Sequence, residues 1–163
     1  MAKILYAVQG TGNGHIARAM EVLPYLSKVS DVDVLVSGTQ SDISLPCQLT
    51  YQLHGLSFTF GNSGSVDFSR TIRAFKPIRF IKDLLNLKVE DYDLVINDFE
   101  PVSAWACKLK NLPCIALSHQ ASFQSHKTPR PEKICRWSEF VLKNYAPTTA
   151  EIGIHFESYD DNI

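Results

Sequence analysis

The chain has 163 residues, 45% of them hydrophobic, which is enough for one sizeable core but not for two full domains. Sixteen basic and seventeen acidic residues give a net charge of -1, so charge supplies no argument for nucleic acid as a partner. No apolar run approaches the ~20 residues that cross a bilayer, and membrane contact is expected to be peripheral at most. Neither C-x-x-C nor zinc-ligand spacing occurs among the cysteines, so we expect reduced thiols, no metal and a cytoplasmic protein.

Short β-rich runs alternate with segments of helical length along the chain. The expected strands are residues 3–9, 32–37, 49–54, 93–97, 114–118 and 151–156, and the expected helices are 15–29, 66–87, 101–110 and 131–145. This alternation predicts an α/β fold with helices on both faces of a mostly parallel sheet, a Rossmann-like three-layer sandwich. A proline interrupts helical hydrogen bonding, so we expect a kink at Pro24 and a break at Pro77, which opens a second helix.

A glycine-rich loop lies between the first expected strand and the first expected helix. It reads Gly10-Thr11-Gly12-Asn13-Gly14-His15. Glycines let backbone amides approach a ligand and a helix N-terminus favours an anion, so the loop predicts a phosphate or diphosphate neighbour. The G-x-G-x-x-G spacing of a dinucleotide site is absent, and the second strand ends in Ser37-Gly38-Thr39-Gln40 without an acidic residue. A glycine-rich turn without a ligand is the alternative.

His15 and Asp98 are the candidate catalytic residues. A neutral imidazole can take a proton near physiological pH, which makes His15 a candidate general base. In a doubly wound sheet of order 3-2-1-4-5-6, the ligand crevice opens at the carboxyl ends of the first and fourth strands. Asp98 ends the fourth, so we expect it to face His15 in an open crevice and to orient the imidazole. Its alternative role is to cap the next helix, although Glu100 lies nearer that helix.

His119 and Gln120 follow the fifth expected strand and reach the same edge of the sheet. They are candidate substrate contacts, and for His119 a loop histidine bonded to backbone is the alternative.

Five basic residues recur every third position through the segment 66–87: Arg70, Arg73, Lys76, Arg79 and Lys82. At ~3.6 residues per turn this spacing spirals around a helix and makes no clean stripe. A solvated helix surface is one interpretation. Peripheral contact with a membrane or with an anionic or lipid-linked acceptor is the other.

Residues 10–15 and the helix after them resemble the first glycine loop of GT-B glycosyltransferases, a superfamily that includes the peptidoglycan N-acetylglucosaminyltransferase and the UDP-sugar glycosyltransferases. Residues 93–99 resemble the stretch of UDP-sugar transferases in which the aspartate aligned with Asp98 assists the histidine aligned with His15. Ser118-His119-Gln120 is similar to the H-E-Q-N segment of the peptidoglycan enzyme.

This resemblance implies one half of a two-domain enzyme. Residues 1–157 would form the N-terminal acceptor-binding domain, and residues 158–163 would begin the linker to an absent donor-binding domain. The implied reaction is inverting and needs no metal or cofactor: a sugar passes from a nucleoside-diphosphate sugar to a hydroxyl of a small-molecule or lipid-linked acceptor. In that reaction His15 and Asp98 are catalytic, and the loop Gly10, Thr11, Gly12, Asn13 and Gly14 binds substrate together with His119 and Gln120.

The implied protein is cytoplasmic, with membrane contact at most at the inner face, and this chain alone is expected to be inactive. The alternatives are an enzyme like UDP-N-acetylglucosamine 2-epimerase and a stand-alone nucleotide- or effector-binding domain.

Overall fold

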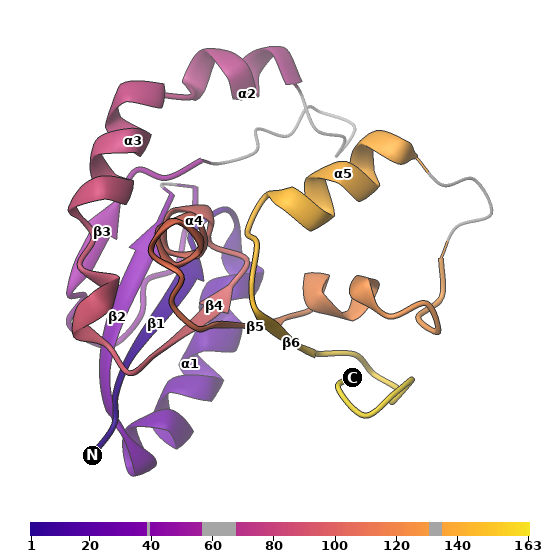
Figure 1. The fold of residues 1–163 in the computed structure, drawn as a ribbon, viewed down its shortest axis with the longest axis horizontal. Helices are drawn as coiled ribbons and strands as arrows, with labels where there is room; N and C mark the ends of the chain where they lie inside the picture. The colour runs from indigo at the N-terminus through magenta and orange to yellow at the C-terminus, as the bar shows by residue number, and fades with distance from the viewer. Residues whose placement is uncertain (39, 57–67, 131–134) are drawn as a thin grey trace.

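The computed structural model describes residues 1–38, 40–56, 68–130 and 135–163 (Figure 1). Within these ranges six strands form one sheet of order β3-β2-β1-β4-β5-β6, and each adjacent pair is parallel. The strands are β1 Lys3–Gln9, β2 Asp31–Ser37, β3 Tyr51–Leu53, β4 Leu94–Asp98, β5 Cys114–Ser118 and β6 Ala150–Gly153. The α/β class and the strand order 3-2-1-4-5-6 are therefore confirmed.

The connections between strands are mostly helical. The α-helices are α1 Asn13–Val29, α2 Phe68–Ala74, α3 Pro77–Asn86, α4 Pro101–Lys110 and α5 Arg136–Asn144, and the 3-10 helices are η1 Val89–Asp91 and η2 Gln120–Gln124. Pro77 opens α3, as expected. The helix α1 continues past Pro24 to Val29, and the kink at Pro24 stays a prediction. Positions 66–67 and 131–134 of the expected helices lie outside the described residues.

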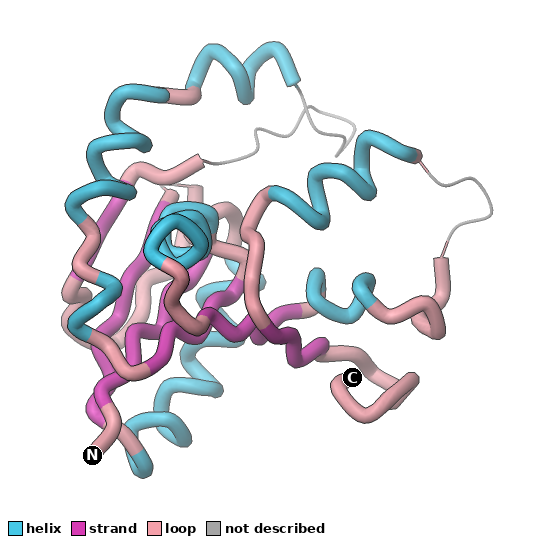
Figure 2. The backbone as a smooth tube through the Cα atoms, in the orientation of Figure 1, coloured by secondary structure: helices cyan, strands magenta, loops and turns pink. Residues whose placement is uncertain are grey.

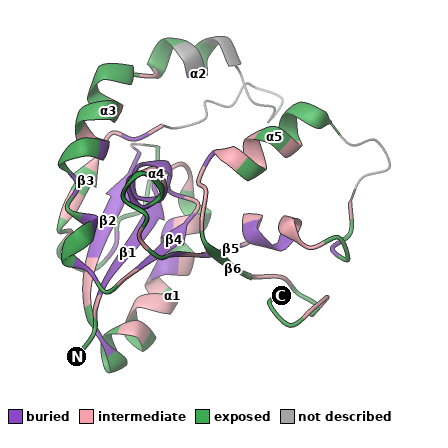
Figure 3. Cartoon of the chain, in the orientation of Figure 1, coloured by how far each residue is buried: buried purple, intermediate pink, exposed green. Residues whose placement is uncertain are grey.

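Helices cover both faces of the sheet and make three layers (Figure 2). Successive side chains of a strand point to opposite faces. On β1, Leu5 and Ala7 pack with residues of α3 and α4, whereas Ile4, Tyr6 and Val8 pack with residues of α1. The continuous apolar run in β1 thus supplies both cores, and burial concentrates on the central strands (Figure 3).

The two edge strands, β3 and β6, are shorter than expected from the runs 49–54 and 151–156. Each pairs with a neighbour on one side only. After β6 the chain turns back, and the amide of Gly153 donates to the carbonyl of Asn162 at 2.8 Å. The runs in the sequence therefore predict edge strands that are longer than the segments that pair in the sheet.

Candidate functional site

The glycine loop joins β1 to α1 at the carboxyl edge of the sheet. Gly10 packs against β2, where an added Cβ would lie 3.0 Å from the carbonyl oxygen of Ser37. Gly12 has a φ of 82°, which L side chains rarely adopt, and a Cβ there would meet no described atom within 4 Å. The same holds for the space at Gly14. Position 10 therefore requires a glycine because β2 packs closely against it, and position 12 because of its positive φ. The space over Gly12 and Gly14 is open.

The other loop side chains hold neighbouring segments. Asn13 Oδ1 accepts from Ser41 Oγ at 3.2 Å and from the amide of Asp42 at 2.9 Å. Thr11 Oγ1 accepts from Gln9 Nε2 at 2.7 Å. Because the N-cap residue of α1 is a glycine, no side chain in the described ranges caps this helix. Uncapped first-turn amides keep their preference for an anion.

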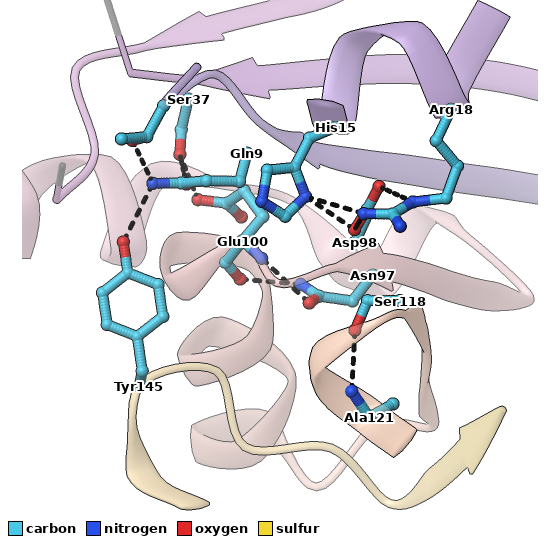
Figure 4. Close-up of polar contacts among 11 residues, drawn as sticks. Gln9, His15, Arg18, Ser37, Asn97, Asp98, Glu100, Ser118, Ala121 and Tyr145 are labelled. Atoms are coloured by element: carbon cyan, nitrogen blue, oxygen red, sulfur yellow. Dashed lines mark hydrogen bonds and ion pairs between the residues drawn. The ribbon is translucent and has the colours of Figure 1, made fainter. Parts of the chain in front are cut away.

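His15 in the first turn of α1 and Asp98 at the end of β4 lie side by side (Figure 4). His15 Nδ1 and Asp98 Oδ1 are 2.8 Å apart, although the residues are separated by 83 positions in sequence. A carboxylate only accepts hydrogen bonds, so Nδ1 carries the proton and the Nε2 lone pair is free to take another. The juxtaposition expected from strand order is present.

Arg18 joins this pair from the next turn of α1. Its Nε donates to Asp98 Oδ2 and its Nη2 to Asp98 Oδ1, each at 2.9 Å, which makes a two-point ion pair (Figure 4). Nη2 also lies 3.1 Å from His15 Nδ1. Since Nδ1 cannot donate to Asp98 and accept from Arg18 at once, the shorter contact to the carboxylate prevails and the approach of Nη2 is not a hydrogen bond.

The expectation of an open crevice is wrong for Asp98. Its side chain is 0% exposed, and that of His15 is 12% exposed. The side chains of His15 and Arg18, both from α1, lie against this carboxylate at the end of β4 and cover it. A buried carboxylate needs a cationic partner, and Arg18 supplies it. The small exposed part of His15 is where a substrate can reach the imidazole.

Glu100 caps α4, the role that was the alternative for Asp98. Its carboxylate accepts from the amides of Val102 at 2.8 Å and Ser103 at 2.7 Å, and Ser37 Oγ donates to it at 2.6 Å. The side chain is fully buried, and burial raises the pKa of its carboxyl. With Glu100 as the cap, the carboxylate of Asp98 is left for His15 and Arg18.

Phe99 separates the two carboxylates with a φ of 56°. This left-handed conformation is strained for a bulky residue, and strain of this kind concentrates at functional sites. Its ring stacks on Tyr145, with 4.7 Å between ring centroids. The Tyr145 hydroxyl in turn contacts Gln9 Nε2 at 2.9 Å and the carbonyl of Leu56. The loop after β4, the end of β1 and the residue after α5 are thus tied together beside the site.

Comparison with known proteins identifies the family. The model of glycosyl transferase family 1 matches residues 2–149. The chain belongs to glycosyl transferase family 1. Among curated proteins, none matches it in sequence.

Solved structures similar to this family 1 chain include MurG of Acinetobacter baumannii, a UDP-N-acetylglucosamine 2-epimerase and the glycosyltransferase SsfS6 of Streptomyces sp. SF2575. MurG is 13% identical with a TM-score of 0.47, the epimerase 9% with 0.51, and SsfS6 13% with 0.43. The matches cover 99%, 93% and 99% of this chain, but only 44%, 41% and 57% of those proteins. The likeness to the epimerase, with its TM-score above 0.5, shows a shared fold. The chain spans about half the length of these three structures.

The other two predicted substrate contacts, His119 and Gln120, follow directly after β5. His119 Nδ1 lies 3.0 Å from the carbonyl of Ile154, so this histidine is bonded to backbone, as its alternative interpretation held. Gln120 begins η2, and its buried Oε1 has no hydrogen-bond partner among the described residues. Gln120 lines a cavity of about 20 Å³ together with Asn97 and Ser118, which is large enough for a water molecule.

Neither a membrane span nor a metal-ligand cluster occurs in the described ranges of the chain. No helix in them is long and apolar enough to span a membrane. No group of three or more His, Cys, Asp or Glu side chains in them suits a metal ion. The expectation of a site that works without a metal stays a prediction.

Three residues at the site were not identified from sequence. Arg18 lies three positions after His15, a spacing that places side chains on one helix face, so a signal was available. Gln9 is a polar residue at the end of an otherwise apolar strand, which also marks it. Tyr145 had no such signal, because its contact with Gln9 spans 136 positions.

Proposed function

We propose that this chain is the N-terminal, acceptor-binding part of a glycosyltransferase that transfers a hexosyl or N-acetylhexosaminyl group from a nucleoside-diphosphate sugar to an acceptor hydroxyl. The observation that carries the proposal is the 2.8 Å contact of His15 Nδ1 with Asp98, which leaves Nε2 as a base beside an open glycine loop. Family membership supports the transferase class. Residues 1–157 would form the acceptor domain and 158–163 would begin the link to a donor-binding domain, without which this chain is inactive.

The proposed reaction begins with the acceptor hydroxyl hydrogen-bonded to His15 Nε2. Its oxygen attacks the anomeric carbon from the face opposite the diphosphate, while the proton passes to Nε2. The new C–O bond forms as the bond to the diphosphate breaks, and the anomeric configuration inverts. Such a base contributes ~10²–10⁴-fold to the rate.

Asp98 has an orienting role in this scheme. It fixes the tautomer of His15 through the 2.8 Å contact and faces the positive charge that develops on the ring. Because Arg18 already offsets the charge of Asp98, orientation matters more than Coulombic stabilisation. The departing diphosphate would lie at the uncapped N-terminus of α1, with no metal or cofactor required.

Substrate contacts are assigned by the space at each loop position. Gly12 and Gly14 face open space, so their backbones can approach a ligand, whereas Gly10 is filled on its Cβ side by β2. Thr11 and Asn13 contribute from the same loop, although both side chains also hold neighbouring segments. His119 and Gln120 would contact the acceptor from the end of β5.

The test is a transfer assay with a panel of UDP- and dTDP-sugars and candidate acceptor alcohols, using protein that also carries the donor-binding domain. His15→Ala should lower the rate of transfer by ~10²–10⁴-fold, as expected for the loss of a general base. His126→Ala is the matched control, because His126 is an exposed histidine outside the site. Full activity of His15→Ala would remove the base from the proposal. Incubation with UDP-N-acetylglucosamine alone tests the epimerase alternative, since an epimerase needs no acceptor.

We also propose that α3 makes peripheral contact with the inner face of an anionic membrane, where a lipid-linked acceptor would be found. Three apolar residues on this helix are exposed: Ile78 by 72%, Ile81 by 55% and Leu85 by 64%. Their spacing keeps them on one face of the helix, which does not include the buried Leu84. Arg79 and Lys82 are exposed on the same helix, and this pairing of apolar and basic residues is typical of interfacial helices.

Sedimentation with vesicles that contain one-third phosphatidylglycerol tests this contact. Ile78→Ser and Ile81→Ser together should lower the bound fraction several-fold. Leu109→Ser is the control, because Leu109 is an apolar residue of similar exposure, 61%, that lies on α4 and not on α3. Equal loss in both proteins, or no binding by the wild type, would rule out α3 as the contact.

A further inference from the structure

A second pocket opens at the carboxyl edge of the sheet. It has a volume of about 320 Å³ and is lined by Arg18, His119, Ile154, His155 and Phe156. Sites for small ligands span ~300–1,000 Å³, so this pocket accommodates a small group. Arg18 is shared by this pocket and the His15–Asp98 pair, since the same guanidinium binds Asp98.

The polar groups around the pocket are mostly hydrogen-bond donors. Arg18 uses Nε and Nη2 on Asp98, and its Nη1 has no partner in the described part of the chain. His155 Nδ1 accepts from the amide of Glu157 at 3.4 Å, which places the ring proton on Nε2 as a donor. No Asp or Glu lines the pocket. A donor-rich site without carboxylates is complementary to an oxyanion.

The rings of the pocket supply flat apolar surface. His119 and His155 stack with their centroids 5.5 Å apart and their planes at 26°. The bond from His119 Nδ1 to the carbonyl of Ile154 fixes one ring of this stack. Phe156 is fully exposed and lies edge-on to His155, with 6.1 Å between centroids. A ligand whose body is a ring would cover this surface while its oxyanion meets the donors.

We propose that this pocket binds a phosphate or carboxylate group of one of the two substrates, with Arg18 Nη1 and His155 as donors and the His119–His155 stack as support. Naming the ligand a substrate rests on the proposed function. Arg18 lies three positions after His15 on α1, so an oxyanion on Nη1 holds its substrate one helical turn from the base. Since Asp98 offsets the charge of Arg18, directed hydrogen bonds set the affinity more than net charge does.

Nuclear magnetic resonance of the histidine ring protons in this chain tests the site without any transfer reaction. Inorganic phosphate, UDP, glucuronate and glucose are titrated separately at constant pH and ionic strength. Phosphate should produce saturable shifts of the His119 and His155 rings. Tighter binding of UDP than of phosphate assigns the oxyanion to the donor, and tighter binding of glucuronate than of phosphate assigns it to the acceptor.

Variants decide whether the shifts come from this pocket. His155→Phe keeps an aromatic ring that can stack on His119 but removes the Nε2 donor, and Arg18→Gln removes the guanidinium. Each should weaken phosphate binding about tenfold or more, as expected for the loss of a hydrogen bond to a charged group. Arg79→Gln, on the exposed surface of α3, should bind as the wild type does. If Arg18→Gln does not fold, His155→Phe still carries the test.

The inference is overturned if phosphate, UDP and glucuronate all fail to saturate the ring shifts. It is also overturned if His155→Phe binds phosphate as tightly as the wild type, or if glucose binds as tightly as glucuronate. These outcomes are independent of the transfer assay on His15→Ala. The oxyanion site and the general base can therefore fail or hold separately.

Discussion

Arg18 and Asp98 form a two-point ion pair in which Nε and Nη2 each lie 2.9 Å from one carboxylate oxygen. The Asp98 side chain is 0% exposed, whereas that of Arg18 is 20% exposed. The pair therefore places a charged carboxylate at the end of a central strand, beneath the candidate base. Removing one partner leaves the other charge buried without compensation, which costs far more than breaking an exposed pair.

Arg18→Met is accordingly expected to lower the free energy of unfolding by ~3–5 kcal/mol. Adding Asp98→Asn removes the uncompensated charge, so the double variant should be more stable than Arg18→Met alone. Urea unfolding of the four proteins measures this coupling. Arg79→Met is the control and should change stability by less than ~0.5 kcal/mol, because its contact with Asp83 is 4.0 Å long and lies near the surface. Equal unfolding midpoints for Arg18→Met and Arg79→Met would contradict a buried charge pair.

A kinetic cycle on His15 and Asp98 tests whether they act as one unit. In protein that carries the donor-binding domain, His15→Ala should lower kcat by ~10²–10⁴-fold. Asp98→Asn should lower it as well, and the double variant should be little slower than His15→Ala, because Asp98 acts through the imidazole. Effects that multiply would show separate roles. The sequence predicted an open crevice around Asp98. Because its ion pair with Arg18 is buried instead, Asp98→Asn is also expected to lower the stability of the fold.

The meeting of His15 and Asp98 could be predicted because strand order decides which strand ends adjoin. Parallel strands present their carboxyl ends at one edge, and in the order 3-2-1-4-5-6 the first and fourth strands are neighbours. The alternation of β-rich and helical segments indicated a parallel sheet, and the glycines marked the loop between β1 and α1. Local sequence patterns were therefore sufficient for the fold and for the two main site residues.

Burial and long-range partners could not be predicted in the same way. Whether Asp98 is open or covered depends on how α1 packs over the end of β4, and no local pattern records that packing. The pocket needs Arg18 from α1 and His155 from the segment after β6, which sequence spacing does not bring together. The contact of Tyr145 with Gln9 likewise depends on where the chain runs after α5.

Glu100 predicts a pH dependence of stability. Burial raises the pKa of its carboxyl, although hydrogen bonds from Ser103, Ser37 and Val102 oppose the shift. The folded state therefore keeps the proton at pH values at which the unfolded state, with a pKa of ~4.3, has released it. The contribution of Glu100 is full below the unfolded pKa and is lost as pH rises through the folded pKa, by at most ~1.4 kcal/mol per pH unit.

Urea unfolding of the wild type and Glu100→Gln between pH 2 and 8 checks this sign. Glutamine cannot ionise, so the wild type should lose stability relative to this variant as pH rises. Asp33 provides a control of opposite sign: burial opposes the change, but hydrogen bonds from Thr50 and Tyr92 lower the pKa of its carboxyl. The wild type should lose stability relative to Asp33→Asn as pH falls below ~3.9. If the wild type instead gains stability relative to Glu100→Gln as pH rises, the hydrogen bonds of Glu100 outweigh its burial.

Phe99 allows backbone strain to be separated from ring packing. Phe99→Gly and Phe99→Ala both remove the ring that stacks on Tyr145 at 4.7 Å, but only glycine adopts the φ of 56° without strain. The glycine variant should therefore be more stable than the alanine variant by ~1 kcal/mol, in a urea unfolding measurement. At the exposed helical position Lys108 the order should reverse, with alanine more stable than glycine by ~1 kcal/mol. If alanine is more stable than glycine at position 99 as well, the loop after β4 relaxes once the ring is gone. The left-handed turn then depends on the contact with Tyr145.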